Sequence, residues 1–114
     1  MKLIGIRYVD VVEEQEKMAA FFEKQLGLGN AWDQQELFQG SIYKAGDSWM
    51  EFWQKSDQMP AGAMLQLIVD DANAFAEHAR QNGLSPHGPV TQHGEIIYYL
   101  TAPNGMPVTL QSKA

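Results

Sequence analysis

The residues with the clearest chemical potential lie in one short run, 49–53, where a carboxylate stands between two tryptophans. In a strand, side chains alternate between two faces, so Trp49, Glu51 and Trp53 are expected to point the same way. Two indoles can stack on an aromatic guest or attract a cation, and the carboxylate supplies the counter-charge. The run therefore predicts a binding face for a neutral or cationic organic molecule, aromatic ones included. The alternative interpretation is that both indoles pack in the sheet or at a dimer interface.

The three histidines do not suggest a catalytic or metal centre by their spacing. His78 lies on an expected helix beside Arg80, where it would be exposed. His87 and His93 flank an expected strand, and a rise of about 3.3 Å per residue places them ~20 Å apart. There is no cysteine, which excludes thiol nucleophiles, zinc–thiolate sites and disulfides together. Glycine-rich phosphate loops and nucleophile elbows are also absent from the sequence.

The composition is that of one ordinary globular domain. A chain of 114 residues with 45% hydrophobic and 19% charged residues can bury a core of its own. Its net charge of −6 disfavours nucleic acid and anionic lipid as partners. No apolar run approaches the roughly 18 residues of a membrane span, and the N-terminus does not resemble a secretion signal. We therefore expect a cytoplasmic protein.

The elements that must position these residues follow from changes in hydrophobic period. Residues 3–12 read as a strand, and the helical spacing of Met18, Phe21, Phe22 and Leu26 predicts a helix that ends at Gly27. A second helix is expected from Ala72, capped by Asp70 or Asp71 and ended by Asn82-Gly83. The remaining strands are expected over residues 31–38, 41–45, 48–54, 63–69, 85–92, 95–102 and 106–112.

The order strand, helix, three strands thus occurs twice. The two helix-ending glycines are 83 − 27 = 56 residues apart, about half the chain, which is typical of a duplicated unit. We expect an α+β protein with modules over 1–54 and 63–114, joined by a connector over 55–62. Each module is too small for a core of its own, so both should pack as a single domain over 1–114.

Several runs give this chain a resemblance to a known superfamily. They are Phe21-Phe22 with Leu26-Gly27-Leu28, residues 65–71, Gly83-Leu84, and Ala102-Pro103-Asn104-Gly105 with Val108-Thr109-Leu110. In order and spacing the chain resembles the vicinal oxygen chelate superfamily, which includes glyoxalase I, extradiol dioxygenases and bleomycin-resistance proteins. The resemblance implies paired βαβββ modules that form a half-open barrel around a cavity, commonly as a homodimer.

The resemblance also implies four metal-ligand positions, one on the first and last strand of each module. In this sequence they fall on Ile6 or Arg7, Glu51, Met64 and Thr109. Neither Ile6 nor Arg7 can donate a lone pair, and the thioether of Met64 suits a hard divalent ion poorly. One carboxylate in four positions predicts a protein without a bound metal, and no other cofactor is expected.

Strand alternation extends the candidate ligand-binding face beyond the tryptophans. If Ile6 faces the cavity, Tyr8 and Asp10 do too; if Arg7 does, the other face of the strand is used, and the sequence leaves this register open. Of the adjacent Tyr98 and Tyr99, only one can face inward. The full candidate set is Tyr8, Asp10, Trp49, Glu51, Trp53, Met64, Gln66, Tyr99, Thr109 and Gln111.

Three functions remain open at this stage. The first is a small-molecule binding protein, similar to the drug-sequestering members of the superfamily. The second is a glyoxalase- or dioxygenase-like lyase or isomerase that uses Glu51 as a general base or an unconventional metal set. The third is a structural or regulatory dimer whose exposed aromatic residues form a partner surface.

Overall fold

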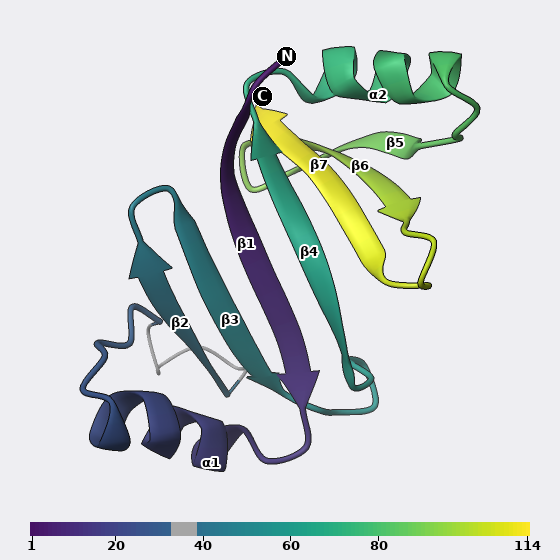
Figure 1. The fold of residues 1–114 in the computed structure, drawn as a ribbon. Coiled ribbons are helices and arrows are strands. Elements are labelled where there is room, and N and C mark those ends of the chain that lie inside the picture. Colours follow the sequence, from purple (N-terminus) through teal and green to yellow (C-terminus); the bar gives the residue numbers. More distant parts are fainter. Residues whose placement is uncertain (33–38) are drawn as a thin grey trace. The chain divides into compact units, whose positions relative to one another are not determined.

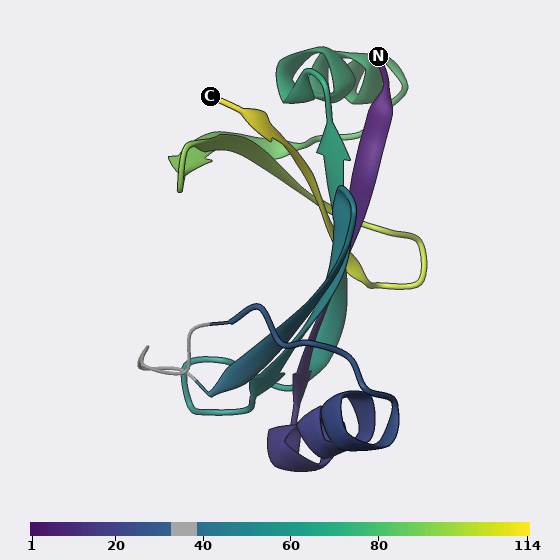
Figure 2. The same ribbon diagram turned by 90° about the vertical axis from the view of Figure 1, so that its left-hand side faces the viewer.

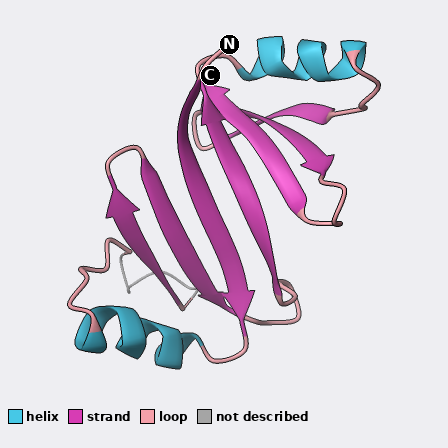
Figure 3. Ribbon diagram, viewed as in Figure 1, coloured by secondary structure: helices cyan, strands magenta, loops and turns pink. Residues whose placement is uncertain are grey.

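A computed structural model describes residues 1–32 and 39–114, which form two compact units (Figure 1). Unit 1 comprises Met1–Arg7 and Met64–Ala114, and unit 2 comprises Tyr8–Ala63. The first strand, β1 (Leu3–Val12), begins in unit 1 and ends in unit 2. Each unit combines strands with one helical segment, so the predicted α+β class is confirmed (Figure 3).

Unit 1 is a mixed sheet with one helix. It contains β4 (Gly62–Val69) from Met64 on, α2 (Ala72–Gln81), β5 (His87–Gln92), β6 (Glu95–Thr101) and β7 (Pro107–Lys113). The strand order is β1-β4-β7-β6-β5, with β4 and β7 parallel and the β7–β6 and β6–β5 pairs antiparallel. Figure 2 shows the β5–β6 hairpin bending away from β4. The predicted order of strand, helix and three strands is confirmed here, with ends within two residues of those expected.

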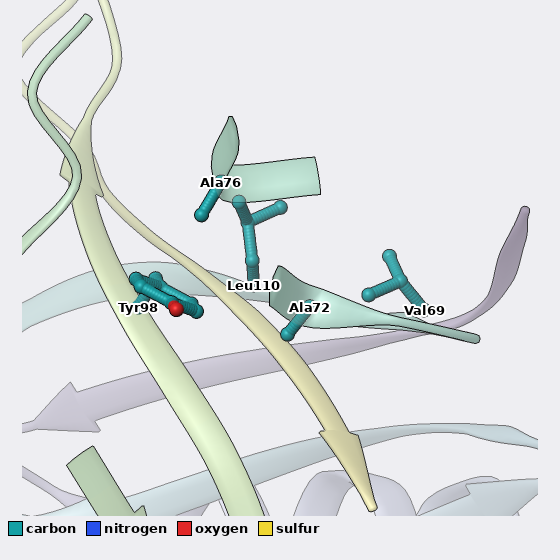
Figure 4. Close-up of a cluster of buried hydrophobic side chains, with 5 residues drawn as sticks. All are labelled: Val69, Ala72, Ala76, Tyr98 and Leu110. Carbon is teal, nitrogen blue, oxygen red and sulfur yellow. The ribbon is translucent and has the colours of Figure 1, made fainter. Parts of the chain in front are cut away.

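The core of unit 1 lies between α2 and one face of its sheet. Val69, Ala72, Ala76, Tyr98 and Leu110 are buried together (Figure 4). Leu67, Phe75, Ile96 and Leu100 pack around this cluster. Alternate residues of β6 thus face the helix, which leaves the intervening ones for the opposite face.

The ends of α2 follow the predicted signals. Asp71 is the N-cap residue, and its Oδ1 accepts a hydrogen bond from the backbone N–H of Ala74 at 3.1 Å. Gly83 follows the helix with φ of 91°, a left-handed conformation that glycine adopts without steric cost. At the buried start of the helix, the backbone N–H of Ala72 donates to the Ser112 hydroxyl at 2.9 Å.

Unit 2 places a helical segment on a hairpin and the end of β1. Its elements are α1 (Gln15–Ala19), the π-helical turn η1 (Ala20–Gln25), β2 (Gly40–Ala45) and β3 (Ser48–Gln54). The strands are ordered β2-β3-β1, and β2 and β3 pair through a two-residue turn at Gly46-Asp47. Of the predicted strand 31–38, residues 33–38 lie outside the described residues, and Ala31 and Trp32 are not in a strand.

Aromatic rings form the helix-facing side of the sheet in unit 2. The ring of Phe22 on η1 stacks on Phe52 with centroids 5.1 Å apart, and it lies 5.1 Å from the ring of Tyr43. The Tyr43 hydroxyl donates to Glu23 at 2.9 Å. Because Phe52 faces η1, the neighbouring Glu51 and Trp53 must face the opposite side of β3.

A buried glutamine ties α1 to the strands beneath it. The Gln15 amide donates to the Ser41 hydroxyl at 3.1 Å and accepts from Gln39 Nε2 at 3.0 Å. The backbone N–H of Gln15 donates to Gln54 Oε1 at 3.2 Å. These bonds satisfy polar groups that would otherwise be costly to bury. Within the described part of the chain, no helix is long and apolar enough to cross a membrane.

Candidate ligand-binding site

The structure brings Trp49, Glu51 and Trp53 together on one face of β3. The indole N–H of Trp49 donates to Glu51 Oε2 at 2.5 Å, and that of Trp53 donates to Oε1 at 2.9 Å. All three side chains are half-buried. A single carboxylate therefore holds two indoles in fixed orientation, with the apolar rings left as the surface that can meet another molecule.

A third tryptophan, Trp32, joins this cluster. Its ring meets that of Trp53 edge-on, with centroids 4.7 Å apart and an interplanar angle of 82°. Asn30 holds the backbone there, because its Oδ1 accepts hydrogen bonds from the N–H groups of Trp32 and Ile42 at 2.9 and 3.0 Å. Sequence reasoning did not include Trp32, since the segment that carries it was expected to be a strand without an assigned face.

Two residues of the neighbouring strand β2, Gly40 and Lys44, lie against the tryptophan cluster. Gly40 pairs with Trp53, and the Trp53 ring lies where a Cβ atom at position 40 would be. Lys44 pairs with Trp49, and its Nζ lies 5.3 Å from the centroid of the Trp49 ring. One ring of the cluster thus already has a cation of the chain beside it.

Tyr8 and Asp10 lie together, but not on the face of Glu51. The Tyr8 hydroxyl donates to Asp10 Oδ2 at 2.9 Å. This hydrogen bond, partial burial and the Asp10 charge raise the pKa of Tyr8. The Tyr8 ring lies 6.2 Å from that of Phe52, which faces η1. The structure therefore places Tyr8 on the helix-facing side of the sheet and does not bring Tyr8 and Asp10 together with Glu51.

In unit 1, the contacts of the Arg7 side chain show which face of β1 Arg7 occupies. Its NH1 and NH2 groups donate to the two oxygens of Glu95, at 3.1 and 3.2 Å. Gln111 Nε2 donates to the same Glu95 Oε1 at 3.2 Å, and the Thr109 hydroxyl donates to Gln111 Oε1. Arg7, rather than Ile6, thus shares a face with the predicted residues Thr109 and Gln111.

The other candidates in unit 1 extend this polar face. Gln66 pairs with Thr109 in the parallel β4–β7 ladder, and Met64 precedes it on the same side of the strand. Tyr99 pairs with Thr109 from β6, and its ring lies 6.4 Å from that of His87. Tyr98 faces α2, so Tyr99 is the member of the pair on the polar face.

The superfamily's metal positions do not carry a fitting set of ligands in this fold. Arg7 is a cation bonded to Glu95, Met64 offers a thioether, and Thr109 offers a hydroxyl that bonds Gln111. Glu51 is the one carboxylate of the four, and its two oxygens accept indole N–H groups. Among residues 1–32 and 39–114, no three or more His, Asp or Glu side chains are grouped to hold an ion.

A pocket of about 250 Å³ lies elsewhere in unit 2, beside the start of α1. Its described lining is Glu13, Glu14, Glu16, Lys17, Gln39 and Gln54. None of these residues belongs to the predicted set, and Lys17 pairs with Glu14 across the pocket wall at 3.1 Å. The tryptophan cluster is thus a separate feature of the same unit.

Comparisons with known proteins show which solved structures share this fold. No protein-family model matches the sequence, and no curated protein sequence matches it. A glyoxalase/bleomycin resistance protein/dioxygenase superfamily member from Vibrio splendidus 12B01 is similar in structure, with a TM-score of 0.72 at 10% identity. That match covers 98% of this chain and 100% of the other.

Two further solved structures share the arrangement. A Streptomyces coelicolor methylmalonyl-CoA epimerase variant in complex with 2-nitronate-propionyl-CoA has a TM-score of 0.69 at 13% identity, covering 99% of both chains. The hypothetical protein BH1468 from Bacillus halodurans C-125 has a TM-score of 0.71 at 17% identity, covering 99% of this chain and 94% of the other. The chain thus has the vicinal oxygen chelate fold, as the sequence resemblance implied.

Proposed function

We propose that this protein binds a small organic molecule, neutral or cationic and preferably aromatic, on the Trp49/Glu51/Trp53 face. The observation that carries the proposal is the convergence of two indole N–H groups on one half-buried carboxylate. A tryptophan pair that only filled a core would be buried and would need no charged partner. Here the rings remain partly open and their orientation is fixed before a ligand arrives, which lowers the entropic cost of binding.

The hydrogen bonding on this face favours a guest that donates rather than accepts. Both indole N–H donors are already used by Glu51, so they offer no donor to a ligand's oxygen. A carboxylate has about four acceptor positions, of which the indoles occupy two. The remaining acceptor positions and the ring faces together suit an ammonium, amidinium or amine attached to a flat ring.

The test is a titration with benzylammonium and benzamidinium, followed by tryptophan fluorescence. We expect saturable binding that weakens by at least tenfold in Trp53→Ala and in Glu51→Gln. Glu77→Gln removes the same charge from an exposed position in unit 1 and is expected to leave the affinity unchanged. Equal affinity in the wild type, Trp53→Ala and Glu51→Gln would overturn the assignment of the site.

A second candidate function is proton transfer next to a carbonyl, with Glu51 as the base. It is favoured by the fixed orientation of the Glu51 carboxylate and by the fold shared with proteins named as methylmalonyl-CoA epimerase. A carboxylate held in place can remove a proton from a suitably placed carbon acid. This function predicts solvent deuterium in the recovered ligand, lost in Glu51→Gln. A binding protein returns its ligand unchanged.

A further inference from the structure

We propose that Arg7 and Gln111 form a carboxylate-binding site in unit 1, which Glu95 occupies as an internal ligand. The guanidinium of Arg7 donates hydrogen bonds to both carboxylate oxygens of Glu95, at 3.1 and 3.2 Å, and the amide of Gln111 donates a third at 3.2 Å. A planar guanidinium that bonds a carboxylate through two parallel N–H groups is a geometry that proteins use to recognise carboxylates. All three residues belong to unit 1, and the proposal does not rest on the function proposed for the tryptophan face.

The Gln111 donor of this site is held in place by a residue other than Glu95. Thr109 and Gln111 are 1% and 3% exposed, so their side chains are fixed in the interior. The Thr109 hydroxyl donates to the amide oxygen of Gln111, which directs the amide N–H group toward Glu95. The two donor residues, Arg7 and Gln111, lie on β1 and β7, whereas the carboxylate of Glu95 that they bind lies on β6.

Glu95 is placed so that its carboxylate can be exchanged. It is the first residue of β6 and directly follows His93 and Gly94, whose φ angles of 51° and 76° form the turn before the strand. The side chains of Arg7 and Glu95 are 16% and 20% exposed, so the pair is partly open to solvent. Because Glu95 is tethered, its effective concentration is high, and a free carboxylate must compete with it.

The ligand class that follows is a carboxylate on a small molecule. In the wild type it must displace Glu95, so simple carboxylates are expected to bind weakly. Once the Glu95 side chain is removed, the Arg7 and Gln111 donors should accept the same group from solution. Rescue of a Glu95 variant by a free carboxylate therefore distinguishes a binding site from an ion pair that only supports the fold.

The experiment measures the melting temperature of Glu95→Ala in sodium acetate and in sodium chloride at equal ionic strength. We expect acetate to raise it saturably, by about 4 °C or more at ten times the dissociation constant. The wild type should need at least tenfold more acetate for the same fractional effect. The double variant Arg7→Met/Glu95→Ala should respond to acetate and chloride alike.

Three outcomes would overturn the proposal. They are equal stabilisation of Glu95→Ala by acetate and chloride, an equal acetate response in the double variant, and no response at all. If Glu95→Ala does not fold in chloride, folding in acetate alone supports the site. If it folds in neither salt, the wild type is titrated to higher concentrations of acetate and of chloride: a saturable response to acetate alone supports the site, and equal responses to the two salts overturn it.

Discussion

Substituting Gly40 by alanine should disrupt the tryptophan cluster without touching any of its polar groups. A Cβ at this position would lie 2.2 Å from Cε3 and 2.4 Å from Cζ3 of Trp53. Ordinary contact begins near 3.4 Å, so the ring must retreat by about 3.4 − 2.2 = 1.2 Å. Such a shift breaks the 2.9 Å hydrogen bond from Trp53 to Glu51.

The magnitude follows from the two effects of this displacement. Overpacking of a filled site costs about 1–3 kcal/mol, and loss of a hydrogen bond to a charged group costs about 1.5–3 kcal/mol. Both arise from the same movement, so we expect a loss of about 2–4 kcal/mol in the free energy of unfolding. Urea denaturation measures this loss, and tryptophan emission reports the changed environment of the indole.

Two controls make the result decisive. Among the described residues, a Cβ at Gly29 would meet no atom within 4 Å, so Gly29→Ala should change the free energy of unfolding by less than about 1 kcal/mol. In the Trp53→Ala background, the penalty of Gly40→Ala should largely disappear, since the clashing ring is gone. An unchanged free energy of unfolding and unchanged emission in Gly40→Ala would refute the packing described for the cluster.

Three further substitutions test the packing of unit 1. Asp71→Ala removes the cap on the Ala74 N–H and should lower the free energy of unfolding by about 1 kcal/mol in urea denaturation, whereas an unchanged value would argue against the cap. Ala76→Leu adds three carbons where the side chain is fully buried and should cost about 1–3 kcal/mol, whereas a neutral result would mean that the core has room. The Lys2 backbone N–H bonds Asp70 at 2.9 Å and, with the N-terminal charge, lowers the pKa of that carboxyl in the folded state. Its stabilisation is therefore present above the unfolded pKa of about 3.9 and is lost as the pH falls through the lower, folded pKa, so Asp70→Asn should flatten the acid limb of the stability profile.

Much of the fold was predictable because local signals and the hydrophobic period agree. The strands 3–12 and 48–54 were placed at the observed bounds, and the two helices end before Gly27 and Gly83 as expected. The shared face of Trp49, Glu51 and Trp53 follows from strand alternation alone, and the structure adds the hydrogen bonds that join them. Strand alternation was enough to predict this shared face because all three residues lie on one strand.

The register of β1 was not predictable, because both of its faces carry apolar residues and one polar residue each. A one-residue slip exchanges every side chain between faces, and that slip separates Tyr8 and Asp10 from Glu51. What settles the register is a bond from Arg7 to Glu95, 88 residues away in sequence. Such a long-range ion pair has no local signal.

The measurement that tests the central claim most directly is a ¹H–¹⁵N correlation spectrum of the three indole N–H groups. The chain has three tryptophans, so Trp32→Phe assigns one signal and Trp49→Phe the next. On titration with benzamidinium, which carries N–H donors on a flat ring, we predict saturable shifts of the Trp49 and Trp53 signals, with the compound recovered unchanged. Binding that moves backbone signals elsewhere while both indole signals stay in place would contradict the proposed site.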